Sequence, residues 1–94
     1  MFWKHYDAVF KKANNLAKEK SKDYVGNESI FDYWIHGEDD IIYEIHKKVL
    51  RMIRQKKFQA GTMSDGIEDS ILDMMCLSAF LYSYIKVKEG KADG

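Results

Sequence analysis

Three acidic side chains stand close together at the point where the chain becomes apolar. Glu68, Asp69 and Asp73 open a stretch that then carries no charge over the twelve residues from Met74 to Ile85. Helical spacing places Asp69 and Asp73 on one face, where two like charges destabilise a helix by roughly 0.2–0.5 kcal/mol. A bound divalent cation would reverse that repulsion, and so would a Lys or Arg from a neighbouring helix. The residues alone leave a metal site and a structural ion pair both open.

The helix N-terminus explains only part of this acidic cluster. We expect Asp65 to cap the helix, with Glu68 three residues later completing a capping box. Acids in a first turn also complement the helix dipole, but that effect fades beyond the first turn. Asp73 lies two turns into the helix and therefore needs another partner.

A second group of charged and polar side chains is expected on one face of the preceding helix. Its acids come first and its bases follow: Asp40, Glu44, Lys47, Lys48, Arg51 and Gln55. One interpretation is a solvated face that suits the helix dipole, with Glu44 and Lys48 paired one turn apart. In the other, Glu44 supplies a carboxylate to a bound cation while Lys48 and Arg51 contact phosphates. His46, in the apolar stripe of this helix, is interpreted as a core histidine.

The composition indicates a small soluble domain. The chain has 94 residues with 15 basic and 15 acidic side chains, so its net charge is zero, and 46% of it is hydrophobic. Balanced charge predicts neither general nucleic-acid nor membrane binding, although six bases lie between positions 47 and 57. The uncharged run that follows the acids is too short to span a bilayer. With a single cysteine and no apolar signal segment, we expect a cytoplasmic protein.

Hydrophobic spacing predicts an all-α fold. The chain has no proline, and its apolar residues recur at helical intervals over about 2–20, 40–57 and 66–86. A short helical connector is expected at 30–35. Three such helices pack as an antiparallel bundle, which we expect to form one domain over residues 1–88 with a frayed tail at 89–94.

Each of the three helices has a predicted core face. In the first helix it consists of Phe2, Tyr6, Val9, Phe10, Ala13, Leu16 and Ala17. In the second helix it consists of Ile41, Ile42, Ile45, Val49, Leu50, Met52 and Ile53. In the third it consists of Ile67, Ile71, Met74, Met75, Ser78, Leu81, Tyr82 and Ile85. The third helix is apolar nearly all round beyond its acids, which is more surface than two neighbouring helices cover. Either a second copy of the chain completes the bundle as a dimer, or the aromatic connector folds over this helix.

Several segments match the pattern of a known family. They are KDYVGN with a Phe seven residues after its Tyr, then IHKKVLRM, and above all DGIEDSILDMM. Over about residues 20–80 the chain thereby resembles the nucleotide modification associated domain family of phages and bacteria. That family is related to the MazG-like all-α pyrophosphohydrolases, which are usually oligomeric. These enzymes use Mg²⁺ to cleave a nucleoside triphosphate (NTP) into a monophosphate and pyrophosphate.

The resemblance implies roles for the residues at matching positions. The implied Mg²⁺ ligands are Glu68, Asp69 and Asp73, and the implied substrate-binding residues are Lys48, Arg51, Asp23 and Tyr24. Magnesium binds one or two carboxylates together with phosphate oxygens and retains several waters. A free carboxylate that deprotonates such a water would generate the nucleophile that attacks phosphorus. Glu44 is the candidate for that catalytic base or for a further ligand.

The chain also departs from the family pattern. Lys47 stands where the family has Asp, and Met75, Cys76 and Leu77 occupy positions where it has a polar segment. Two hypotheses follow: a Mg²⁺-dependent NTP pyrophosphohydrolase, or a catalytically inactive relative that binds nucleotides or another protein. Nucleic-acid binding through the basic residues of the second helix is a third, less favoured hypothesis, because no known DNA-binding motif accompanies them.

Overall fold

The described part of the chain forms three long α-helices. The computed structural model describes residues 1–25, 34–58 and 63–93, with side chains at 1–20, 34–57 and 63–90. Its elements are α1 (Phe2–Val25), α3 (Glu38–Phe58) and α4 (Asp65–Asp93). The predicted all-α fold is confirmed. Helix α1 continues to Val25 instead of ending at Lys20, and α4 continues to Asp93 instead of Lys86.

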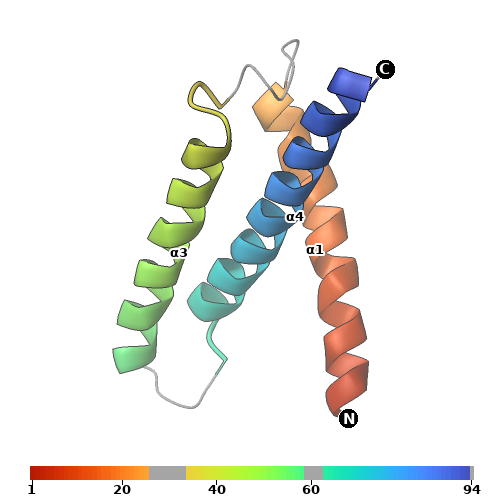
Figure 1. Cartoon of the computed structure of the whole chain (residues 1–94). Coiled ribbons are helices and arrows are strands. Elements are labelled where there is room, and N and C mark those ends of the chain that lie inside the picture. The colour runs from red at the N-terminus through yellow and green to blue at the C-terminus, as the bar shows by residue number, and fades with distance from the viewer. Residues whose placement is uncertain (26–33, 59–62, 94) are drawn as a thin grey trace.

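Helix α4 is the central element. It packs against both α3 and α1 (Figure 1). Helices α1 and α4 run in the same general direction and cross, whereas α3 runs in the opposite direction. The result is an elongated body of 47 × 27 × 23 Å. Because α4 contacts both neighbours, its side chains contribute to both helix–helix interfaces.

The core consists of two small clusters joined by α4. One contains the buried Ala13, Leu72 and Cys76, between α1 and α4. The other contains the buried Trp34, Ile41 and Leu77, between α3, the turn before it and α4. Phe80 of α4 packs against both clusters. Trp34 thus brings the end of the predicted connector onto α4, while residues 30–33 of that connector lie outside the described part of the chain.

The predicted core faces were only partly right. In α4 the buried residues lie on the side that carries Asp73, whereas the expected core face is half-buried or exposed, with Tyr82 66% exposed. In α1, Phe2 and Phe10 are 70% and 52% exposed. The physical reason is that α1 and α3 pack on one side of α4. When a helix is apolar all round, its sequence does not predict the side on which the other helices of the chain pack.

The N-terminus of α4 is capped one residue earlier than predicted. The Ser64 Oγ accepts a hydrogen bond from the Ile67 N–H at 3.2 Å, and the Ser64 carbonyl accepts one from the Glu68 N–H at 2.9 Å. Ser64 is therefore the N-cap, and the predicted capping box at Asp65 was wrong. Asp65 and Glu68 still lie in the first turn, where they complement the helix dipole.

The length and composition of α4 also bear on membranes. Residues Asp65–Gly90 form a helix long and apolar enough to cross a bilayer by those two criteria, with a mean hydropathy of 1.3 over an 18-residue stretch of it. Core helices of soluble proteins pass the same test. Length and composition of α4 are therefore compatible with a membrane-spanning helix and with the central helix of a folded core.

Helices α3 and α4 meet closely near the first turn of α4. Ser70 is 1% exposed, and its Oγ lies 3.0 Å from both the Gln55 Oε1 and the Gly66 carbonyl oxygen. A Cβ at Gly66 would lie 2.6 Å from the Gln55 Nε2. Glycine at this position therefore leaves the room that Gln55 needs to reach Ser70.

We predict that Gly66→Ala changes the free energy of unfolding by less than about 0.5 kcal/mol, because the gain in helix propensity is offset when the added Cβ displaces the flexible end of Gln55 from the Ser70 hydroxyl. Gly90→Ala is the matched control in the same helix, since nothing lies within 4 Å of its added Cβ. That control should raise stability by roughly 0.5–1 kcal/mol through helix propensity. Urea unfolding followed by circular dichroism measures both. Equal stabilisation by the two substitutions would contradict the close contact.

Candidate functional site

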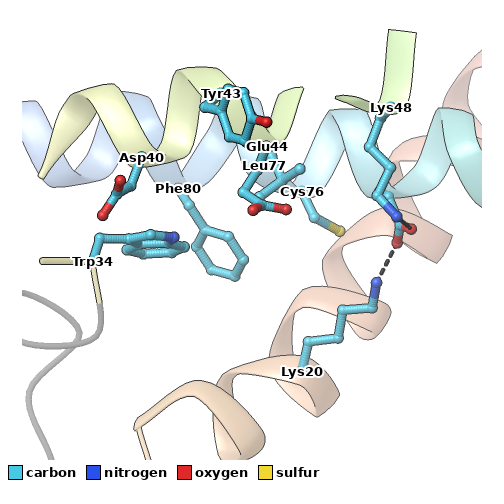
Figure 2. Close-up of a pocket in the computed structure, with 10 residues that line it drawn as sticks. Lys20, Trp34, Asp40, Tyr43, Glu44, Lys48, Cys76, Leu77 and Phe80 are labelled. Atoms are coloured by element: carbon cyan, nitrogen blue, oxygen red, sulfur yellow. Dashed lines mark hydrogen bonds and ion pairs between the residues drawn. The ribbon is translucent and has the colours of Figure 1, made fainter. Parts of the chain in front are cut away.

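The candidate site is built around the carboxylate of Asp73. Lys48 of α3 places its Nζ 3.0 Å from Asp73 Oδ2, and Lys20 of α1 forms a second ion pair with Asp73 Oδ1. The Asp73 side chain is only 14% exposed. Figure 2 shows Lys20 and Lys48 approaching this point from opposite sides. One carboxylate thus links all three helices.

The two ammonium groups determine the protonation of Asp73. Burial by itself would raise the pKa of this carboxyl, because it disfavours the charged form. The hydrogen bonds and charges of Lys20 and Lys48 outweigh that effect, so the pKa of Asp73 lies below its ordinary value. Asp73 is therefore ionised at neutral pH and neutralised by its partners.

A cavity of about 340 Å³ opens beside this ion cluster. Its lining contains two lysines, three acids, three aromatic residues and two small core residues: Lys20, Lys48, Asp40, Glu44, Asp73, Trp34, Tyr43, Phe80, Cys76 and Leu77. In Figure 2, Trp34 and Phe80 lie at one end, Lys20 and Lys48 at the other, and Glu44 between them. The cavity therefore has an aromatic end and a cationic end.

A tight turn positions the aromatic end. The Gly37 N–H donates to the Trp34 carbonyl at 2.9 Å, and Gly37 adopts a φ of 64°, which favours glycine. The His36 N–H then donates to Asp40 Oδ2 at 2.8 Å, which fixes that carboxylate at the start of α3. The Trp34 and Phe80 rings pack at a centroid distance of 6.0 Å and an angle of 50°. The turn thus places one aromatic ring and one carboxylate at the same end of the cavity.

Cys76 closes the floor of the cavity. It is 3% exposed, and its Sγ lies 3.2 Å from the Ala13 carbonyl oxygen, to which the thiol donates. Burial raises the pKa of this thiol, against a smaller lowering effect of Lys20. A buried thiol held in its neutral form is a packing residue and not a nucleophile.

The structure brings some of the predicted site residues together and separates others. Glu44, Lys48 and Asp73 line the same cavity. Glu68 lies elsewhere, paired with Lys12 of α1 at 2.9 Å. Asp69 is exposed and borders the same shallow hollow as Glu68.

The remaining predicted residues do not line the cavity within the described part of the chain. Arg51 is exposed on α3. The backbone of Asp23 and Tyr24 continues α1, and their side chains lie outside the described residues. Lys47, which stands where the resembled family has Asp, forms an ion pair with Glu44 at 2.8 Å. Lys47 therefore meets a predicted catalytic carboxylate directly.

The three acids predicted to bind Mg²⁺ do not form a metal site in this arrangement. Among the residues with described side chains, no group of three or more His, Cys, Asp and Glu lies close enough to hold a metal ion. Two lysines occupy the position beside Asp73 that a cation would need. Of the two partners left open for Asp73, the structure contains the lysines of neighbouring helices, and Mg²⁺ binding stays a prediction.

Sequence reasoning missed Lys20, Trp34 and Tyr43. The sequence predicts Lys20 at the end of the first helix, and nothing in that position indicates that its side chain reaches Asp73. Trp34 was interpreted only as a cover for α4. Its position just before His36–Gly37 could have indicated a ring fixed by a tight turn.

Comparison of the chain with known protein families, with curated proteins and with solved structures finds no match in any of the three.

We predict that Asp73 contributes an acid-sensitive part of the stability. Because its pKa is lower in the folded than in the unfolded chain, this contribution is fully present above the unfolded pKa of about 3.9 and is lost as the pH falls through the folded pKa. Asp73→Asn should lower the free energy of unfolding by roughly 1–3 kcal/mol at pH 7. The loss should shrink in acid.

Urea unfolding between pH 7 and pH 3 tests this dependence. Asp69→Asn is the control, because Asp69 is exposed and lies one turn earlier on α4. That variant should keep the acid dependence of the wild type. A stability of Asp73→Asn equal to the wild type at pH 7 would contradict the assigned ion cluster.

Proposed function

We propose that the cavity between the three helices binds a nucleoside phosphate, with its phosphates at Lys20 and Lys48. The observation that carries this proposal is the convergence of two ammonium groups from different helices on one carboxylate at the cavity wall. The Lys20 and Lys48 side chains are 32% and 25% exposed, so an incoming phosphate can reach them. A phosphate would join the Asp73 carboxylate as a second anionic partner, because each ammonium group has three N–H donors.

The other end of the cavity suits a nucleobase. The half-buried Phe80, which packs against the buried Trp34, offers aromatic surface at this end, and stacking of a base on such a ring contributes roughly 1–3 kcal/mol. The volume of about 340 Å³ lies within the range of small-molecule pockets, which is roughly 300–1,000 Å³. Aromatic groups at one end and cations at the other match the two ends of a nucleotide.

A MazG-like relationship is part of this proposal. It is supported by the all-α fold and by two residues at matching positions, Lys48 and Asp73, which line one cavity together with Glu44, the candidate base. The proposal replaces Arg51 by Lys20 as the second phosphate-binding cation. It also separates Asp73 from Glu68 and Asp69, which border a different hollow, where Glu68 pairs with Lys12.

Hydrolysis between the α- and β-phosphates is the second candidate function. It is favoured by Asp40 and Glu44, two carboxylates one turn apart on α3 that line the same cavity. Magnesium, when bound with a nucleotide, needs only one or two protein carboxylates and neutralises phosphate charge. In this candidate Glu44 holds or removes a proton from the attacking water, and the Lys47–Glu44 ion pair must open first.

We predict that a nucleoside triphosphate raises the thermal stability of the protein and binds with measurable heat. Lys48→Met and Lys20→Met should each weaken binding by roughly tenfold or more, because each removes a charged phosphate contact. Lys12→Met is the matched control, since it also breaks an ion pair between α1 and α4 but lies outside the cavity. It should bind nucleotide as the wild type does.

Calorimetry and thermal unfolding with a panel of ribo- and deoxyribonucleoside triphosphates, with and without Mg²⁺, test this prediction. A ligand that binds only the folded state must stabilise it. No stabilisation by any nucleotide would reject nucleotide binding. Equal losses in Lys12→Met and Lys48→Met would reject the assigned site.

Pyrophosphate release separates binding from hydrolysis. If the second candidate is right, the protein with Mg²⁺ releases pyrophosphate. Glu44→Gln should then lower the rate of release by a factor of roughly 100 or more, while nucleotide binding persists. Nucleotide binding without release by the wild type would reject hydrolysis and leave the inactive nucleotide-binding module. Release that Glu44→Gln does not change would reject the role of Glu44.

A further inference from the structure

Helix α3 carries a stripe of exposed apolar side chains on a side that α4 does not cover. The sequence predicts Ile42, Leu50 and Ile53 as core residues, but they are 51%, 44% and 50% exposed. Together with the exposed His46 they recur at intervals of three and four residues, so they share one face of the helix. Another side of α3, which contains the fully buried Ile41, packs against α4 (Figure 1).

A basic stripe runs beside the apolar one. Lys47, Arg51 and Arg54 each follow a member of the apolar stripe by one residue, so they lie next to it on the helix surface. Residues 45–58 contain six bases and no acid, whereas the whole chain has 15 of each. We call the exposed residues of this side the α3 outer face: Ile42, His46, Lys47, Leu50, Arg51, Ile53, Arg54, Lys56 and Lys57.

Most of this positive charge is not neutralised within the described part of the chain. Two of the six bases pair with acids that line the cavity of the candidate site. The other four are exposed and form no ion pair with a described acid: Arg51, Arg54, Lys56 and Lys57. The helix dipole favours bases only in the last turn, where Lys56 and Lys57 lie. It therefore explains neither the two arginines nor the apolar stripe beside them.

We propose that the α3 outer face binds the surface of an anionic phospholipid bilayer, with α3 lying in the plane of the interface. In helices that bind such interfaces, apolar side chains enter the boundary between headgroups and acyl chains, while neighbouring bases contact the anionic headgroups. Clusters of roughly four to eight bases on an amphipathic helix are typical of binding to acidic lipids. From Ile42 to Lys57 the face is about 22 Å long at 1.5 Å per residue.

This inference is independent of the proposed binding of a nucleotide. No residue of the α3 outer face lines the cavity of the candidate site. The cavity residues of α3 are Asp40, Tyr43, Glu44 and Lys48, which lie outside this face. Vesicle binding and nucleotide binding can therefore be gained or lost separately.

A nucleic acid fits the α3 outer face less well than an acidic bilayer does. Both partners offer negative charge to the bases. A phosphate backbone, however, offers no apolar surface to Ile42, Leu50 and Ile53, whereas the acyl boundary of a bilayer does. The apolar stripe therefore decides between the two partners.

A second copy of the chain also lacks part of the required chemistry. In a two-fold contact the same face meets itself. The α3 outer face contains bases and no acid, so the bases of one copy would meet no acid on the same face of the other. Anionic headgroups supply that negative charge.

Cosedimentation with phospholipid vesicles tests the proposal. The protein should bind vesicles made of equal parts of phosphatidylglycerol and phosphatidylcholine, and it should not bind vesicles of phosphatidylcholine alone. Binding should weaken as the salt concentration rises, because salt screens the attraction between exposed charges. No binding to the anionic vesicles at low salt, or equal binding to both kinds of vesicle, would overturn the proposal.

A pair of charge variants assigns the binding to α3. Arg54→Gln combined with Lys57→Gln should weaken binding to the anionic vesicles by roughly tenfold or more, because two bases next to the headgroups are lost. Lys4→Gln combined with Lys11→Gln is the matched control, since it removes the same charge from two exposed lysines of α1. The control should bind nearly as the wild type does. Equal losses in the two variants would overturn the assignment to α3.

An apolar variant separates a bilayer from the other two partners. Ile53→Gln should weaken vesicle binding severalfold with unchanged helical circular dichroism, because glutamine is a good helix former. Val87→Gln is its control, since Val87 is an exposed apolar residue of α4, and it should bind vesicles as the wild type does. Vesicle binding that Ile53→Gln leaves unchanged would overturn the apolar contact.

Binding of a short DNA duplex, measured by fluorescence anisotropy, and molar mass from sedimentation equilibrium are recorded in parallel. Without vesicle binding, DNA binding that is lost in the Arg54 and Lys57 variant would overturn the proposal in favour of a nucleic acid. A doubled mass that Ile53→Gln abolishes, again without vesicle binding, would overturn it in favour of a second copy.

Discussion

The structure depends on one carboxylate that two lysines share. Asp73 of α4 contacts Lys20 of α1 and Lys48 of α3, so a single side chain connects helices that otherwise meet α4 through two small apolar clusters. Removal of one partner of such a cluster leaves a half-buried charge without compensation. The same arrangement holds two ammonium groups at the wall of a cavity. Stability and the proposed binding of a phosphate therefore depend on the same two lysines.

The sequence predicted the elements well because local patterns determine them. Periodicity and the absence of proline indicated three helices, and the dipole argument singled out Asp73 as the acid that needs a partner. The face of Glu44 and Lys48 also proved to line the cavity. The pairing of Lys20 with Asp73 could not be predicted, because it depends on the crossing of α1 over α4. The buried side of α4 could not be predicted either, because α4 is apolar nearly all round beyond Asp73. Leu77 is buried, whereas Ser78, which belongs to the predicted core face, is exposed.

Helix α4 serves two surfaces at once, and Cys76 belongs to both. Its side chain lines the cavity of the candidate site and also an apolar groove between α1 and α4. It is held between them by its contact with the Ala13 carbonyl. A residue at this point must be small and apolar, because a larger side chain would occupy one of the two spaces. This explains why an uncharged segment directly follows Asp73.

The most direct test of the account is the pKa of the Asp73 carboxyl, measured by carbon-13 NMR titration of the folded protein. The account predicts a value below the ordinary pKa of an aspartate, about 3.9. It also predicts that the value rises when Lys20 and Lys48 are both replaced by Met, because burial then acts alone. A pKa at or above the ordinary value in the wild type, or one unchanged by the double substitution, would contradict the shared carboxylate.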